Sequence, residues 1–162
     1  MRPTQTKHTL EVTTPSDREI VMTRVLVAPR TLVFDAFTQP ELIKRWLLGP
    51  DGWSMPVCDV NLRVGGAFRY EWRSDGRDIQ FGISGVYREI VRPERLVHVE
   101  TMDGQPGQAT ITTTFAEHDG LTTVTMTNLY DSVEVRDIAL ESGMDGGVAA
   151  SYDRLEEVLA TL

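Results

Sequence analysis

Apolar and polar residues alternate over several segments of this chain, which is typical of β-strands that bury one face. The clearest case is residues 67–73, where Phe68, Tyr70 and Trp72 occupy one face and charged residues occupy the other. The same reasoning, with β-branched residues and turn signals such as Asp75-Gly76 between the segments, predicts further strands. These lie at residues 19–27, 53–60, 79–91, 95–102, 109–117 and 121–129. Successive turns at short spacing indicate an antiparallel meander.

A different period marks the helices. Residues 31–37 and 41–47 follow Pro29 and Pro40, which are tolerated where a helix starts. Near the C-terminus, Ser132 is a suitable N-cap for a helix over residues 133–140. Apolar residues then recur every three or four positions over residues 144–162, which predicts a long amphipathic helix. Gly143, with two further glycines just after it, predicts a kink or a restart between these two helical segments.

The predicted order is strand, two short helices, six strands and a long C-terminal helix. A sheet that is apolar on one face must cover that face, and the long helix is the element large enough to do so. We therefore expect an α+β helix-grip fold, in which a curved antiparallel sheet wraps around the C-terminal α-helix. Residues 1–17 are polar and are expected to form a flexible arm or an edge segment. Residues 18–162 are expected to form a single domain.

Composition narrows the class of protein. The chain has 162 residues, one cysteine and a formal net charge of -8. It has no Cys/His cluster for zinc, no apolar run near the about 18 residues of a membrane span, and no secretory signal. A net acidic chain without a basic face is a poor nucleic-acid binder. We therefore expect a cytoplasmic protein that binds neither nucleic acid nor membranes, and no metal or other cofactor is indicated.

Known catalytic motifs are scarce. There is no dinucleotide-binding or nucleoside triphosphate-binding glycine loop, and the segment around Ser84 lacks the final glycine of a G-x-S-x-G nucleophile motif. Cys58, beside an apolar residue on a strand, is expected to be a buried small side chain. His98 and Glu100 are the weak catalytic candidates, because they share one face of a strand and would form an acid–base pair if they faced inward. We favour the other orientation, in which Val97 and Val99 face inward and His98 and Glu100 face water.

Aromatic residues give the main indication of a binding site. Many of them would crowd the space between the sheet and the long helix, either as plain core or as the wall of a cavity. Tyrosine, asparagine and the threonines of the Thr-rich strands would add polar groups there, and Gly147 would leave room in the helix. The expected lining residues are Trp46, Phe68, Tyr70, Trp72, Phe81, Met126, Asn128, Met144, Gly147 and Tyr152.

Short motifs spread over residues 18–162 resemble one family. They include Val27-Ala28-Pro29, the run at residues 33–38, Arg45-Trp46, the run at residues 59–68, and the segments at 85–90, 93–97, 143–147 and 151–155. In order and spacing they are similar to the START-like (SRPBCC, Bet v 1-like) superfamily, within the branch of the activator of Hsp90 ATPase homologue 1. The resemblance implies the helix-grip fold. It also implies a cavity in which superfamily members bind lipids, sterols, polyketides or hormones, and in which some cyclise polyketides.

Three functions follow in order of preference. The first is binding of a small hydrophobic molecule between the sheet and the helix. The second is a polyketide cyclase-like or hydrolase-like enzyme, with His98, Glu100 or Tyr70 as the acid–base group. The third is an interaction protein that stimulates an Hsp90-type chaperone or pairs as a homodimer, with the acid-rich segment 132–162 as a docking face. The chaperone role ranks last, because we expect no chaperone-binding domain in the residues before the first strand.

Overall fold

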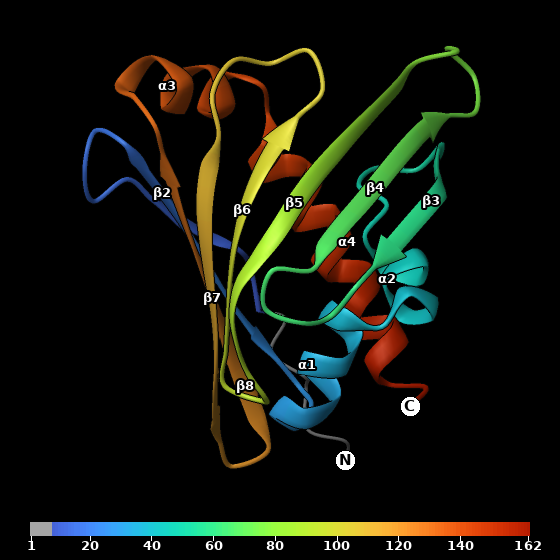
Figure 1. The fold of residues 1–162 in the computed structure, drawn as a ribbon. Coiled ribbons are helices and arrows are strands. Elements are labelled where there is room, and N and C mark those ends of the chain that lie inside the picture. The colour runs from blue at the N-terminus through green and yellow to red at the C-terminus, as the bar shows by residue number, and fades with distance from the viewer. Residues whose placement is uncertain (1–7) are drawn as a thin grey trace.

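The computed structural model describes residues 8–162 and shows an open, curved antiparallel sheet with helices on its inner side (Figure 1). Within these residues there are eight strands and four helices. The strands are β1 (Glu11–Thr13), β2 (Glu19–Leu26), β3 (Trp53–Val60), β4 (Ala67–Ser74), β5 (Gln80–Val91), β6 (Arg95–Met102), β7 (Ala109–His118) and β8 (Leu121–Tyr130). The helices are α1 (Arg30–Thr38), α2 (Pro40–Trp46), α3 (Val133–Glu141) and α4 (Met144–Leu159). This is the α+β helix-grip fold expected from the sequence.

The sheet has the strand order β1-β2-β8-β7-β6-β5-β4-β3, and every neighbouring pair is antiparallel. Strands β3 to β8 follow one another as a meander, which the regular turn signals predicted. Strand β2 closes against β8, so the first and last long strands of the chain are neighbours. The result is one continuous sheet that curves around the helices on its inner side.

Strand β1 is the one element that lies within the expected N-terminal arm. It is a short edge strand whose residues pair with Val21 to Thr23 of β2. Val12 explains its position, because its side chain packs against a core cluster that contains Ile20 and Met22. Part of the segment expected as an arm is therefore an ordered edge, and residues 1–7 of that segment lie outside the described residues.

The two short helices begin as their prolines predicted. Pro29 occupies the N-cap of α1, and Pro40 is the first residue of α2. At each site the fixed φ of proline suits a helix start, where a missing N–H costs little. The helical region at the C-terminus restarts at Gly143, which has a φ of 77°, a left-handed conformation that favours glycine. Ser132 accepts a hydrogen bond from Val135 N at 3.2 Å and caps α3 as expected.

The main core lies between the sheet, α1 and α4. Helix α4 contributes the apolar stripe that the sequence predicted, and its members Tyr152, Leu155 and Leu159 are buried. A second cluster lies under α3 and the start of α4, around Ile20 and Tyr130. A third lies under α2 and includes Ile43, Met55, Cys58 and Trp72. The helices therefore pack against the inner face of the sheet, at β2, β7 and β8 on one side and at β3 on the other.

Candidate functional site: the inner face of the sheet

Strand register brings a row of inner-face residues together across five strands. Phe68 of β4 pairs with Gly85 of β5, Gly85 with Glu100 of β6, Glu100 with Ala109 of β7, and Ala109 with Tyr130 of β8. Glu100 is thus flanked by the two smallest residues of the row. The larger aromatic side chains stand at the two ends. This row is the centre of the candidate site.

Position 85 has to be a glycine, because the ring of Phe68 lies directly against it. A Cβ atom at this position would lie 2.2 Å from Cε1 and Cζ of Phe68 and 2.9 Å from the carbonyl oxygen of Val99. These distances are shorter than van der Waals contact, so a side chain here would displace the ring. The glycine lets Phe68 lie flat on β5 and form part of the wall beside Glu100.

His98 and Glu100 face inward, and the expectation that Val97 and Val99 do so is wrong. Leu96, on the same face as His98, is 4 % exposed and belongs to the main core. The His98 ring packs edge-on against Phe68 at 4.9 Å between centroids. The physical reason is register, because His98 pairs with buried residues on both neighbouring strands, whereas the valines occupy the outer face.

The imidazole and the carboxylate form a direct pair. His98 Nε2 lies 2.7 Å from Glu100 Oε1. Their side chains are 17 % and 26 % exposed although both lie on the face that the helices cover. Water therefore reaches this part of the inner face. The second oxygen of Glu100 is available as an acceptor, since the contact with His98 occupies Oε1.

The hydroxyls of Tyr70 and Tyr130 lie within electrostatic reach of this carboxylate, and Tyr87 is a third inner-face tyrosine beside Tyr70. Burial raises the pKa of Tyr70 well above its usual value, with the charge of Glu100 adding to the rise. Burial also raises the pKa of Tyr87 and of Tyr130 to about 12, and Glu100 contributes to the rise at Tyr130. All three hydroxyls therefore keep their protons near neutral pH. They can donate or accept hydrogen bonds with a polar group placed among them.

The helical side of the site is formed by the start of α4. The Tyr130 hydroxyl lies 3.5 Å from the Met144 sulfur, and Met126 packs in the same cluster. Gly147 follows less than one turn later and flanks the inward stripe of α4. A Cβ built on Gly147 meets no atom within 4 Å. Open space therefore lies beside this glycine, and its use by a ligand stays a prediction.

The other expected lining residues occupy well-packed positions behind the row. Trp46 Nε1 donates to the Ala36 carbonyl at 2.8 Å, and Trp72 Nε1 donates to the Leu47 carbonyl at 2.7 Å. Asn128 Nδ2 donates to the Ile20 carbonyl at 3.1 Å, and Phe81 stacks on Trp72 at 4.9 Å. These side chains therefore fix the walls, and their contact with a ligand stays a prediction.

Tyr152 lies deeper, between α4 and the short helices. Its ring contacts Phe37 and Trp46, and its hydroxyl is buried without a hydrogen-bond partner. Burial raises the pKa of this hydroxyl, so it stays protonated. The expected contact between Tyr152 and a ligand also stays a prediction.

Most threonines of the Thr-rich strands do not reach the inner face. Those at positions 110, 112 and 114 of β7 alternate with buried Ile111, Thr113 and Phe115, and so lie on the outer face. The same alternation on β8 places those at 123, 125 and 127 outside. The expectation that these strands would supply hydroxyls to the cavity is therefore wrong for most of them.

Sequence reasoning did not select three residues that matter here. Tyr87 and Tyr130 share the inner face with Gly85 and Asn128, and strand alternation could have placed them there. Arg24 is buried on β2, where its guanidinium lies 3.0 Å from Asp153 Oδ1 and 3.2 Å from Glu156 Oε1 of α4. Arg24 occupies a position of β2 at which the alternating pattern calls for an apolar residue. This mismatch could have identified it from the sequence.

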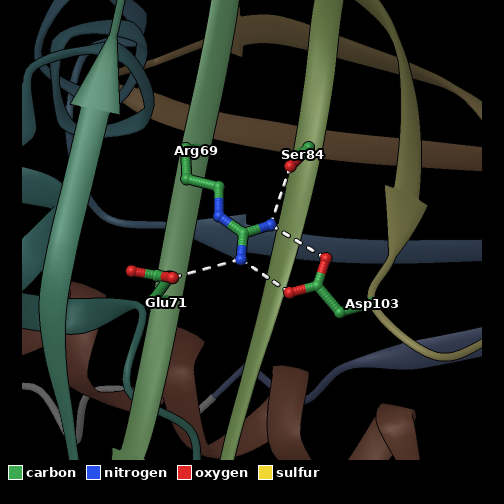
Figure 2. Close-up of polar contacts among 4 residues, drawn as sticks. All are labelled: Arg69, Glu71, Ser84 and Asp103. Atoms are coloured by element: carbon green, nitrogen blue, oxygen red, sulfur yellow. Dashed lines mark hydrogen bonds and ion pairs between the residues drawn. The ribbon is translucent and has the colours of Figure 1, made fainter.

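Ser84 and Cys58 are not placed for nucleophilic catalysis. Figure 2 shows Arg69 lying across the outer face of β4 and β5, where its Nη1 donates to Ser84 Oγ at 2.8 Å. The same guanidinium bridges to both carboxylate oxygens of Asp103, at 2.9 and 2.6 Å, and to Glu71 at 3.1 Å. Burial raises the pKa of the Cys58 thiol to about 11, so it is not a thiolate near neutral pH.

The outer face also carries a hollow of about 480 Å³ beside Arg69. Its lining includes the apolar side chains of Val86 and Val99 and the polar side chains of Asp59, Arg88 and Thr101. Arg69 is held by Asp103 and Glu71, so its charge is already compensated. Among residues 8–162, no group of three or more His, Cys, Asp or Glu side chains is arranged to hold a metal ion. No helix in this described part of the chain is long and apolar enough to cross a membrane.

A curved sheet that grips a C-terminal helix, with a partly water-accessible inner face, defines a START-like helix-grip protein. The sequence model of the activator of Hsp90 ATPase homologue 1-like proteins matches residues 27–160. The chain therefore belongs to this family. No curated protein matches the sequence.

Solved structures agree with this assignment. A protein from Rhodobacter sphaeroides is 27% identical with a TM-score of 0.89, and the match covers 95% of this chain and 99% of that one. The protein CV1439 from Chromobacterium violaceum is 25% identical with a TM-score of 0.79, over 89% of this chain and 98% of that one. An AHSA1-like protein from Aeromonas hydrophila, at 23% identity and a TM-score of 0.70, covers 86% of this chain and 92% of its own and shares the fold.

Proposed function

We propose that this protein binds a small, largely apolar molecule between the inner face of the sheet and helix α4. The observation that supports this most strongly is the exposure of His98 and Glu100, at 17 % and 26 %, on the face that the helices cover. If core side chains filled this space, water could not reach His98 and Glu100. Burial of such polar side chains without hydrogen-bond partners is costly. Apolar walls with a few convergent polar groups are typical of small-molecule sites.

The ligand would contact five of the residues expected from the sequence. Phe68 and Tyr70 would line the β4 side, Met126 the β8 side, and Met144 and Gly147 the helix. Thioether side chains adapt their shape to different ligands, so the two methionines suit an apolar body of variable outline. Burial of that body would stabilise the complex by about 25 cal/mol per Å² of apolar surface.

Native mass spectrometry of the purified protein tests the proposal. A bound molecule would appear as an added mass that disappears when the protein is unfolded, and its mass would identify its chemical class. A protein that carries no added mass and also binds no neutral hydrophobic dye such as Nile red would contradict the proposal.

A second candidate function is acid–base catalysis on a polyketide-like substrate. The inward pair of His98 and Glu100, with 2.7 Å between its atoms, favours this alternative. The test is turnover of aromatic polyketide thioesters or lactones by the wild type and by His98→Gln and Glu100→Gln. An enzyme of this kind would lose most of its turnover in both variants while still binding Nile red. Equal product formation with and without protein would exclude it for those substrates.

The interaction role stays a prediction. The family is named for an activator of the Hsp90 ATPase, so stimulation of the cognate chaperone's ATPase is the relevant assay. Sedimentation of the purified protein tests the expected homodimer. Unchanged ATPase activity at saturating protein would contradict the chaperone role, and a monomer at high concentration would contradict the dimer. A cytoplasmic location likewise stays a prediction, which fractionation of the source cells would test.

A further inference from the structure

The charge of the inner face indicates which polar group a ligand would carry. The row Phe68–Gly85–Glu100–Ala109–Tyr130 places the carboxylate of Glu100 between two small residues. Neither Gly85 nor Ala109 has a side chain long enough to cover it. The Glu100 side chain is 26 % exposed, so its carboxylate is accessible to solvent.

The surrounding groups do not neutralise this charge with a fixed cation. Arg24 is the only arginine or lysine among the buried residues that the structure describes. Its guanidinium already contacts the carboxylates of Asp153 and Glu156. His98 contacts one oxygen of Glu100 and leaves the other. The tyrosines near the carboxylate are held in their protonated form, partly by the charge of Glu100 itself.

A ligand anion would face the same repulsion that acts on a tyrosinate here. A protonated amine would instead gain a charge-assisted hydrogen bond to the open oxygen of Glu100. Aromatic faces near the carboxylate, including that of Phe68, also attract cations. The apolar body of such a molecule would extend from the row toward Met144 and the open space beside Gly147.

We infer that the ligand of the inner face is an apolar molecule with a protonated amine, and that Glu100 binds the amine. This inference rests on the proposed binding function and specifies the chemical class that the same site accepts. Glu100 determines specificity, while the apolar walls supply the part of the affinity that does not depend on charge.

Three matched probes test the inference: naphthylethylamine, naphthylethanol and naphthylacetic acid, each titrated into the protein by calorimetry near neutral pH. The wild type is expected to bind the amine at least about tenfold more tightly than the acid, since one charge-assisted hydrogen bond is worth that much. Glu100→Gln is expected to lose about tenfold in affinity for the amine and to bind the alcohol as before. Glu157→Gln removes the same formal charge from an exposed position of α4 and should change neither.

The outcomes separate this inference from the proposed function. If the acid binds as tightly as the amine, or if Glu100→Gln binds the amine unchanged, the inference is wrong while binding of the alcohol and of Nile red still supports a hydrophobic site. If neither Nile red nor any of the three probes binds the wild type, the proposed function fails and the inference fails with it. Should Glu100→Gln not fold, the order of the three affinities in the wild type decides.

Discussion

Filling the space beside Gly147 should block ligand binding without destabilising the protein. A Cβ at this position meets no atom within 4 Å, so Gly147→Ala introduces no clash. Replacing glycine by alanine within a helix stabilises it by about 0.5–1 kcal/mol, because the unfolded chain loses conformational freedom. For a domain of this size, that corresponds to a rise in melting temperature of about 1–4 °C.

Gly146 provides the matched control. It lies in the same turn of α4, and a Cβ built on it also meets no atom within 4 Å, but it is exposed on the opposite side of the helix from the buried stripe. Gly146→Ala should therefore stabilise the protein by a similar amount. The stability effects of the two variants then differ only if the space beside Gly147 is not open.

The leucine variants separate stability from binding. Gly147→Leu places an apolar side chain at the edge of the proposed ligand space and should weaken Nile red binding at least about tenfold, which is a loss of about 1.4 kcal/mol. Gly146→Leu, which points to solvent, should bind the dye as the wild type does. Melting temperatures from calorimetry and dye titrations provide the two readouts. A loss of more than about 1 kcal/mol in Gly147→Ala, or wild-type dye affinity in Gly147→Leu, would refute the reasoning, because either result means that the space is absent or unused.

Three further predictions concern the rest of the molecule. Gly85→Ala should destabilise the protein by about 1–3 kcal/mol, because the new Cβ would overlap the Phe68 ring; an unchanged denaturant midpoint would contradict this. Cys58 should resist alkylation by iodoacetamide at mildly alkaline pH in the folded protein, because burial raises its pKa to about 11, and it should react once unfolded; rapid modification of the native protein would contradict its burial. The pairing with Arg69 lowers the pKa of Asp103 below its unfolded value, so its contribution to stability exists above the unfolded pKa and is lost as the pH falls through the folded one. The stability difference between the wild type and Asp103→Asn should therefore shrink on acidification below about pH 4, and a difference that grows there would contradict the pairing.

The strands and the fold could be predicted from the sequence because most strands contrast apolar and polar faces. Residues 67–73 are such a case, since charged residues mark the outer face and aromatics the inner one. Strand β6 lacks this contrast, because Leu96 lies on one face and Val97 and Val99 on the other. Periodicity alone could not decide between them, and the orientation of His98 and Glu100 was assigned incorrectly for that reason.

The centre of the site could not be derived from the sequence, because it depends on strand register. Gly85 and Ala109 are far apart in the chain and flank Glu100 only through the pairing of three strands. The short strand β1 was also hard to recognise, since Val12 is the one apolar residue among its three positions. The aromatic residues near the site were found, but sequence alone did not distinguish the row at Phe68 from the packed wall at Trp46.

NMR of the protein labelled with ¹³C at its methionine methyl groups tests most directly whether a ligand binds on the inner face. Met126 and Met144 line the proposed ligand space, whereas Met55 lies in the separate cluster under α2. On titration with Nile red, the account predicts that the methyl signals of Met126 and Met144 shift in proportion to saturation while that of Met55 stays in place. Saturable binding that leaves both Met126 and Met144 unshifted would contradict the account and would place the ligand elsewhere on the molecule.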